Sequence, residues 1–243
     1  MDWDKRFRQQ AEWTRLLRAY LFDKTGLVDA QRVLEVGCGT GVLLAGLPTR
    51  AAVHGLDLDP DRLAEARQHA PTAWLARGDA LCLPYHSAIF DITFCHFLLL
   101  WVLNPLQAMH EMRRVTRPGG CVLALAEPDY SGRIDLPKAL EPLGRWQAES
   151  LRRQGADPNL GRRLGELFAG AGITVIETGC LSKCETHSLM RGEWQMEWGV
   201  LEADLAGVVP DEELKRIKKL DEEAWMSGER VLYVPTHYAW GRL

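Results

Sequence analysis

The chain has 243 residues, of which 47% are hydrophobic and 26% charged, and its net charge at pH 7 is -4. This apolar fraction is ordinary for globular proteins, so it excludes a disordered chain, a collagen-like repeat and a small disulfide-stapled scaffold. Proteins that bind nucleic acid usually carry a basic excess, and this chain carries none overall. We therefore expect a globular protein whose partner is not a nucleic acid.

The cysteines and the apolar runs indicate the compartment. Several of the six cysteines lie inside apolar runs, where cysteine behaves as a small hydrophobe, and no CxxC pair exists. The first residues are too polar for a signal peptide. The longest apolar run, 97–103, has 7 residues, far below the roughly 20 that span a membrane. The sequence therefore predicts a cytoplasmic protein in a reducing compartment, without a membrane partner.

Strand-like runs alternate with amphipathic stretches through the first half of the chain. The predicted strands are 32–36, 53–57, 73–76, 90–95 and 121–126, with helices at 42–47, 60–69 and 105–116 and a turn at 118–120. Strands that alternate with helices favour a parallel sheet covered on both faces. We expect a doubly wound α/β fold with a mostly parallel, seven-stranded, Rossmann-like sheet.

The flanking segments are less regular. Helices are predicted at 1–22, 137–155 and 160–171, a strand at 173–178, two helices within 188–228, and a last strand at 229–233 that 237–240 extends or follows. No linker rich in Pro, Gly or Ser divides the chain. We expect one domain over 1–243, made of a helical cap (1–30), a core (31–130), helices with the sixth strand (131–187), a helical insertion (188–228) and a final strand (229–243). The cap and the insertion are predicted to form a lid.

A glycine-rich loop follows the first predicted strand. The run VLEVGCGTG (33–41) places Gly37, Gly39 and Gly41 between a strand and a helix. Glycine allows a tight turn and close approach of a ligand at the carboxyl end of a parallel strand. A dinucleotide fingerprint would read GxGxxG. Here the third glycine comes one residue early, and the nearby Glu35 opposes a pyrophosphate and favours a nucleoside with a cationic centre.

Acidic residues and a histidine follow the next three strands. Asp57 ends the second strand and can accept both hydroxyls of a ribose. Asp79, after the third strand, can accept from an adenine amine. Both acids could instead be helix caps or turn residues. His96 ends the fourth strand, beside the glycine loop, and is a candidate general base.

These elements, in this order, resemble the class I S-adenosylmethionine-dependent methyltransferases. The similarity is to the methyltransferase type 11 branch, which includes ubiquinone- and menaquinone-biosynthesis enzymes. The matching runs are VLEVGCGTG (33–41), GLDLDP (55–60), GDALCLP (78–84), FDITFCHFLLLWV (90–102) and MRRVTRPGGCVLALAEPD (112–129). The resemblance implies a Rossmann-like fold and S-adenosylmethionine as cofactor.

The resemblance also implies cofactor-binding residues. Glu35, Gly37, Cys38 and Gly39 would line the methionine part. Asp57 would hold the ribose, with Leu58 on the adenine. Asp79 and Ala80 would contact the adenine edge, and Cys95 would contribute main-chain contacts.

Methyl transfer from a sulfonium mainly needs positioning of the reactants and exclusion of water. A general base is needed only when the acceptor keeps its proton up to the transition state. His96 is the catalytic candidate, with packing at a strand end as its alternative. The candidate substrate-binding residues lie after the fifth strand or on the lid: Glu127, Asp129, Tyr130, Trp13, Tyr20 and Trp194.

We expect a methyltransferase that acts on the oxygen, nitrogen or carbon of a small organic acceptor, as a monomer or homodimer. The alternatives are a non-catalytic S-adenosylmethionine-binding module and an NAD-dependent oxidoreductase. We expect no metal, because Cys180, Cys184 and His187 offer only three clustered ligands where structural zinc takes four.

Overall fold

The computed structural model describes residues 3–47, 50–181, 184–186 and 191–243. Its centre is a seven-stranded sheet in the order β3-β2-β1-β4-β5-β10-β7. In that order the strands are Trp74–Arg77, Ala52–Asp57, Arg32–Val36, Phe90–Cys95, Thr116–Pro128, Thr236–Arg242 and Thr174–Leu181. β10 runs antiparallel to both β5 and β7, while the pairings from β3 to β5 are parallel. The expectation of a mostly parallel seven-stranded α/β sheet is confirmed.

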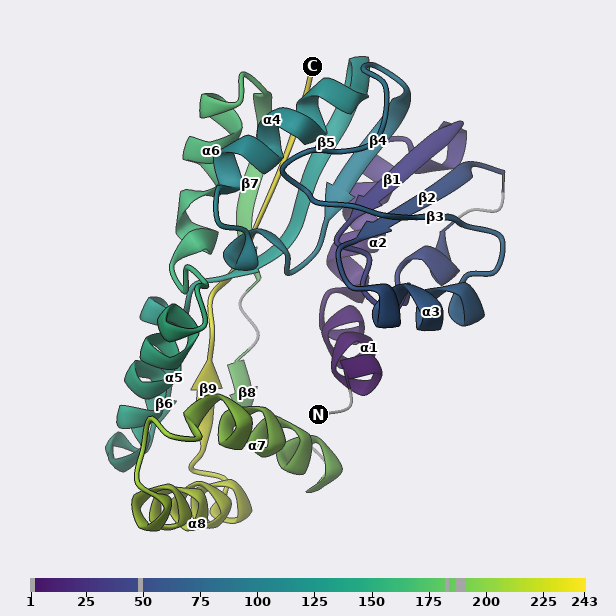
Figure 1. The fold of residues 1–243 in the computed structure, drawn as a ribbon. Coiled ribbons are helices and arrows are strands. Elements are labelled where there is room, and N and C mark those ends of the chain that lie inside the picture. Colours follow the sequence, from purple (N-terminus) through teal and green to yellow (C-terminus); the bar gives the residue numbers. More distant parts are fainter. Residues whose placement is uncertain (1–2, 48–49, 182–183, 187–190) are drawn as a thin grey trace.

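Helices cover both faces of this sheet (Figure 1). The α-helices of the described residues, including those that lie away from this sheet, are α1 (Trp3–Trp13), α2 (Arg15–Lys24), α3 (Pro60–His69), α4 (Pro105–Val115), α5 (Pro142–Arg153), α6 (Leu164–Gly170), α7 (Arg191–Leu205) and α8 (Asp211–Ser227). Alternate residues of β1 enter different cores: Val33 packs with α2 and α3, whereas Leu34 and Val36 pack with α4 and α6. This two-residue alternation is what a strand buried on both faces requires.

A second group of elements lies at one end of the main sheet (Figure 1). It contains α5, α7, α8 and a small sheet in the order β6-β9-β8, formed by Ile134–Leu136, Val231–Tyr233 and Cys184–Thr186. Its apolar core is separate from the two cores of the main sheet and includes Trp194 and Trp198. Both indole Nε1 atoms donate to Asp221 Oδ2 at 2.7 Å, which fixes α7 against α8.

Three local predictions were wrong. The predicted helix at 42–47 is only the short 3-10 turn Leu44–Gly46, because six residues with a glycine near the end are too few to sustain an α-helix. The predicted helix at 1–22 is divided at Thr14 into α1 and α2. The predicted turn at 118–120 lies inside β5, since Gly119 N–H donates to Leu243 O and Leu243 N–H donates to Gly120 O.

The end of the chain was expected to form a last strand at 229–233 that 237–240 extends or follows. It forms two strands in different sheets, β9 and β10, separated at Pro235, whose ring removes a ladder donor. The small sheet that contains β6 was not expected. Among the described residues no helix is both long and apolar enough to cross a bilayer.

Candidate functional site

The glycine loop after β1 has the backbone conformation that glycine alone adopts readily. The φ angles of Gly37, Gly39 and Gly41 are 75°, 52° and 76°. A Cβ on Gly37 would lie 2.6 Å from Leu98 Cδ1, and one on Gly39 would lie 2.8 Å from a ring carbon of Phe7. The loop is therefore a bare backbone turn with close neighbours, which side chains at these positions would crowd.

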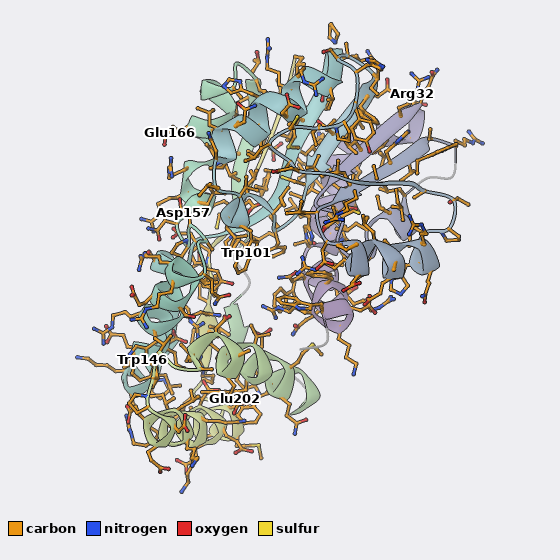
Figure 2. All side chains as sticks on the ribbon, viewed as in Figure 1. Arg32, Trp101, Trp146, Asp157, Glu166 and Glu202 are labelled. Atoms are coloured by element: carbon orange, nitrogen blue, oxygen red, sulfur yellow. The ribbon has the colours of Figure 1, made fainter. Side chains whose placement is uncertain are left out.

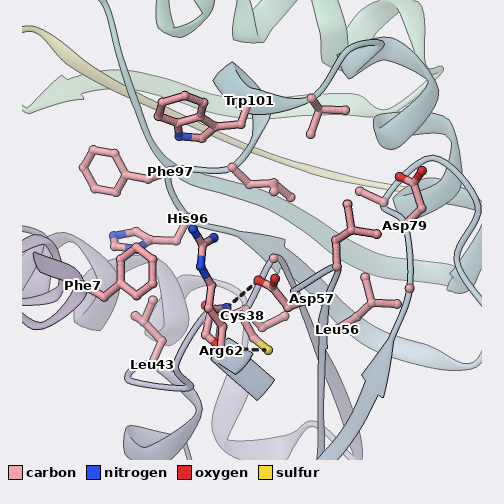
Figure 3. A pocket seen from close by; sticks show the side chains of 18 of the residues that line it. Phe7, Cys38, Leu43, Leu56, Asp57, Arg62, Asp79, His96, Phe97 and Trp101 are labelled. Carbon is pink, nitrogen blue, oxygen red and sulfur yellow. Dashed lines mark hydrogen bonds between the residues drawn. The ribbon is translucent and has the colours of Figure 1, made fainter. Parts of the chain in front are cut away.

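A cavity of about 660 Å³ opens at the carboxyl ends of β1, β2, β3 and β4. This is where ligands bind in doubly wound sheets. The aromatic side chains of Phe7, His96, Phe97 and Trp101 gather at one end, and Asp79 lies at the other (Figure 3). Trp101 lies on the side of the main sheet that faces the second group of helices (Figure 2). The predicted cofactor residues in its wall are Glu35, Gly37, Cys38, Gly39, Asp57, Leu58, Asp79 and Ala80.

Asp57 ties β2 to the glycine loop. Its Oδ2 accepts from Gly39 N–H at 2.8 Å and its Oδ1 accepts from Asp59 N–H at 2.9 Å. Each carboxylate oxygen can accept a further bond, so Asp57 can hold a diol in the cavity while it keeps the loop in place. Helix α3 is capped by Asp59 instead, which accepts from Asp61 N–H.

At the far end of the cavity, Asp79 Oδ1 accepts from Leu81 N–H at 2.9 Å. Its other carboxylate oxygen forms no hydrogen bond with the described residues and can accept one from a ligand. Leu58 is 63% exposed although it is a large apolar side chain. An exposed leucine in a cavity wall is suited to cover a flat apolar group.

Glu35 is a buried acid whose charge is incompletely paired. It is 1% exposed, and its Oε2 has no hydrogen-bond partner. Burial raises the pKa of Glu35 well above its ordinary value, the nearby Asp57 adds to this, and the charge of Arg18 on α2 opposes it. Arg18 Nη1 is likewise buried and unpartnered. Glu35 lines the large cavity, so its unsatisfied oxygen can accept a hydrogen bond from a ligand there.

Sequence reasoning missed Arg18 because it lies on a helix outside the motifs. The signal available was its spacing of four residues from Thr14, which places both side chains on one helix face.

His96 is held in one tautomer by Thr14. The Thr14 hydroxyl has one proton, and the carbonyl oxygens of Gln10 and Ala11 lie 3.1 and 3.3 Å away to accept it. His96 Nε2 lies 2.9 Å from that hydroxyl, and the direction of this bond depends on the tautomer of the ring. Because two backbone carbonyl oxygens are placed to accept the hydroxyl proton, we assign Nε2 as the protonated nitrogen. On this assignment Nδ1 is the unprotonated nitrogen, and it has no hydrogen bond among the described residues. Burial, assisted by the charge of Arg18, lowers the pKa of His96 to about 3, so the ring is neutral at physiological pH.

Three other predicted residues lie behind the cavity wall. Glu127 is fully buried and accepts the N–H groups of Leu98, Leu99 and Leu100 at 2.9, 2.9 and 3.2 Å. Burial raises its pKa to about 7 despite these bonds. Glu127 thus fixes the loop after β4 rather than lining either cavity.

Asp129 pairs with Arg162 at 2.6 Å. Cys95 is fully buried in β4, between β1 and β5. Burial raises the pKa of its thiol.

A second, smaller cavity of about 120 Å³ adjoins the first at Phe97, which lines both. Trp13 and Tyr130, predicted to contact substrate, line it. Phe97 has φ 52°, which is unusual for a bulky side chain and points to a functional constraint.

Besides Glu127 and Asp129, two aromatic residues that were predicted to contact substrate line neither cavity. Tyr20 is 42% exposed, and its hydroxyl donates to Glu177 Oε2 at 3.0 Å. Trp194 is buried in the helical core, bound to Asp221. Both follow the amphipathic pattern, but the pattern does not distinguish a pocket wall from a helix interface.

The cysteine and histidine cluster is only partly described. His187 lies outside the described residues, as does the side chain of Cys184. Cys180 is exposed and its thiol is free.

Comparison with known proteins decides the family. The profile of a family described as "Methyltransferase domain" matches residues 34–124. Malonyl-[acyl-carrier protein] O-methyltransferase of Erwinia pyrifoliae is 31% identical over 182 residues, 72% of this chain and 68% of that protein. The chain belongs to the class I S-adenosylmethionine-dependent methyltransferases.

The other matches are consistent with this methyltransferase family. The protein of the same name from Halorhodospira halophila is 38% identical over 104 residues, 40% of this chain, and that match spans only 35% of the relative's length. A solved candidate methyltransferase from Bacillus halodurans shares the fold, with a TM-score of 0.67, 17% identity, and coverage of 92% of this chain and 97% of that one.

The cofactor of this methyltransferase chain is S-adenosylmethionine, and the large cavity fits it. The unpartnered Glu35 Oε2 suits the ammonium group of the methionine part. The glycine turn provides a surface without side chains. S-adenosylmethionine therefore agrees with both the family and the acidic residue beside the glycine loop, whereas NAD does not.

Proposed function

We propose that this chain transfers the methyl group of S-adenosylmethionine to a small organic acceptor, at oxygen, nitrogen or carbon. The observation that carries the proposal is the meeting of two cavities at Phe97. The larger cavity has the features expected of the cofactor site, and the smaller gives an acceptor a place beside it. A non-catalytic binding module would have no need of the second cavity.

The cofactor supplies a methyl group that is already activated by the sulfonium. The chain's task is then to hold both reactants and to exclude water. We assign Glu35 to the ammonium group, Asp57 to the ribose hydroxyls, and Leu58, Asp79 and Ala80 to the adenine. Helix α1 covers this site, since Phe7 lies against Gly39 and lines the cavity.

His96 is assigned to orient the acceptor. Its pKa of about 3 means that the ring is neutral and carries a single proton at neutral pH. Its free Nδ1 can accept a hydrogen bond from an O–H or N–H of the acceptor, which turns a lone pair of the acceptor atom toward the methyl group. Thr14 keeps Nδ1 in that state.

The proposed cellular location and partners are based on the net charge and the cysteines. The net charge of -4 favours a free small molecule over nucleic acid or a membrane surface. Cys38, Cys95 and Cys121 are buried free thiols, as is usual in a reducing cytoplasm. We propose a cytoplasmic monomer or homodimer that folds as one domain.

The test has two steps. Calorimetric titration with S-adenosylhomocysteine and with NAD should show binding of the first only; binding of NAD without S-adenosylhomocysteine would overturn the proposal. Incubation with methyl-labelled S-adenosylmethionine and a metabolite panel should then transfer label to at least one small molecule. Cofactor binding without any transfer, also to cell-extracted small molecules, would favour the non-catalytic alternative.

A further inference from the structure

The small cavity contains a buried arginine that is only partly paired. Arg6, on α1, is 9% exposed and lines this cavity. Its Nη1 donates to Gln9 Oε1 and to Glu197 Oε1, each at 2.7 Å. Its Nε and Nη2 have no hydrogen-bond partner among the described residues, and neither atom is completely enclosed by the protein. For a side chain this buried, these two atoms face the cavity.

Other arginines of this chain bind carboxylates through the Nε–Nη2 edge of the guanidinium. Arg133 donates through Nε and Nη2 to the two oxygens of Asp135 at 2.7 and 2.9 Å. Arg114 donates through the same two atoms to Glu111, both at 2.7 Å. A guanidinium edge matches the spacing of two carboxylate oxygens. In Arg6 that edge is unused.

Neighbouring groups hold the Arg6 edge in place and add a donor. The guanidinium lies 4.8 Å from the centroid of the Trp13 ring, which fixes its plane. The Tyr130 hydroxyl also belongs to the cavity wall, within electrostatic reach of Arg6 and Arg133. No described residue forms a hydrogen bond with it, so its proton is available to a ligand.

The charge of the wall agrees with an anionic ligand. Two arginines, Arg6 and Arg133, and one acid, Glu197, line the cavity, an excess of one positive charge. Asp135 lies outside the wall but pairs with Arg133, as Glu197 pairs with Arg6, so each arginine has one acidic partner. An anion in the cavity would therefore be held by the unused donors of Arg6.

We propose that the acceptor of the proposed methyl transfer carries a carboxylate, which the Nε–Nη2 edge of Arg6 binds in the small cavity with the Tyr130 hydroxyl as a further donor. This rests on the proposed function and names the acceptor's class. The volume of about 120 Å³ limits the enclosed end of the acceptor to roughly the size of benzene, which a cavity of about 150 Å³ can hold.

The test uses carboxylates paired with their neutral amides. The full chain is first saturated with S-adenosylhomocysteine, and acetate, butyrate and benzoate are titrated against acetamide, butyramide and benzamide at constant salt, with binding followed by ligand-detected NMR. At least one acid should bind tenfold or more tightly than its amide. Equal affinities in all three pairs, or no binding of any acid, would overturn the inference.

Variants locate the effect. Arg6→Lys keeps the charge but loses the edge, and should reduce the preference for the acid several-fold. Arg6→Gln combined with Glu197→Gln removes both members of the ion pair together and should abolish the preference. Arg15→Gln removes an exposed arginine of α2, 61% exposed, that pairs only with Glu12 among the described residues, and should leave it unchanged. A preference that survives the double variant would place the carboxylate elsewhere.

The titration with S-adenosylhomocysteine distinguishes failure of the proposed function from failure of the carboxylate assignment. A chain that fails to bind this compound contradicts the proposed function itself. A chain that binds it but does not distinguish acids from amides contradicts only the carboxylate assignment. Circular dichroism on each variant confirms that it is folded.

Discussion

The two cavities differ in how their walls are made. The large cavity lies at the ends of β1 to β4, which are neighbours in one parallel sheet, and the glycine turn after β1 is part of its wall. The small cavity is formed by side chains from α1, the segment after β5, α5, α7 and the residues around β9. A site made by adjacent strand ends can be read from short motifs. A site assembled from separated helices and loops depends on tertiary packing and is free to vary with the acceptor.

The largest effect is expected in the large cavity, from Asp57→Ala. The change removes an acceptor for Gly39 N–H and Asp59 N–H and, on our assignment, the ribose contact. The two hydrogen bonds from the ribose hydroxyls to this carboxylate contribute about 1.5 kcal/mol each. Their loss corresponds to roughly a 100-fold rise in the Kd for S-adenosylhomocysteine, which calorimetry would measure. Asp61→Ala, in the exposed first turn of α3, is the matched control. An unchanged Kd for Asp57→Ala would remove this residue from the cofactor site.

Glu127→Gln should affect the wall that the two cavities share. The amide can accept through one oxygen, and its NH₂ group would face backbone N–H donors of Leu98, Leu99 and Leu100. We expect the free energy of unfolding to fall by about 3 kcal/mol, measured by denaturant titration. The same change at Glu166, 72% exposed on α6, should stay within about 0.5 kcal/mol of the native chain. Equal stability of both variants would show that Glu127 is not what holds this loop.

A smaller, kinetic effect is expected at the junction of the cavities. Thr14→Val removes the acceptor for His96 Nε2–H and frees the ring to turn or change tautomer. With the acceptor identified, kcat should fall about tenfold, the range of one neutral hydrogen bond, with little change in the Kd for S-adenosylhomocysteine. Thr14→Ser should restore it. Nitrogen-15 NMR of the imidazole should show a protonated Nε2 in the native chain; a protonated Nδ1 would contradict the assignment.

The smallest effect concerns pH and His96. With a pKa of about 3, His96 stays neutral from pH 5 to 9 and should contribute no inflection there. Glu127, with a pKa of about 7, gains a proton below that pH. A proton on Oε2 displaces the N–H of Leu100, while Oε1 still accepts from Leu98 and Leu99, so activity should fall moderately as the pH drops below about 7. His96→Gln should lower the rate without moving this inflection. A profile whose inflection disappears in His96→Gln would assign the titration to the histidine.

The motifs located most of the large cavity in advance. Eight of the predicted cofactor residues line it, because each lies at or just beyond the carboxyl end of a strand of the parallel sheet and these ends meet at one edge. Glu127 was expected to touch substrate but is turned to the backbone of the loop after β4. Position after a strand does not reveal whether a side chain points into a cavity or back toward a neighbouring loop.

The sequence alone determined the α/β class, the glycine turn and the acids that follow β2 and β3, because these features depend on local backbone geometry and two-residue alternation. Only the tertiary structure decided that Arg6 and Tyr130 line one cavity, that the Thr14 hydroxyl meets His96 Nε2, and that Tyr20 and Trp194 lie outside both cavities. These pairings join residues far apart in the chain, and each depends on how helices pack against the sheet and against one another, which no local pattern records.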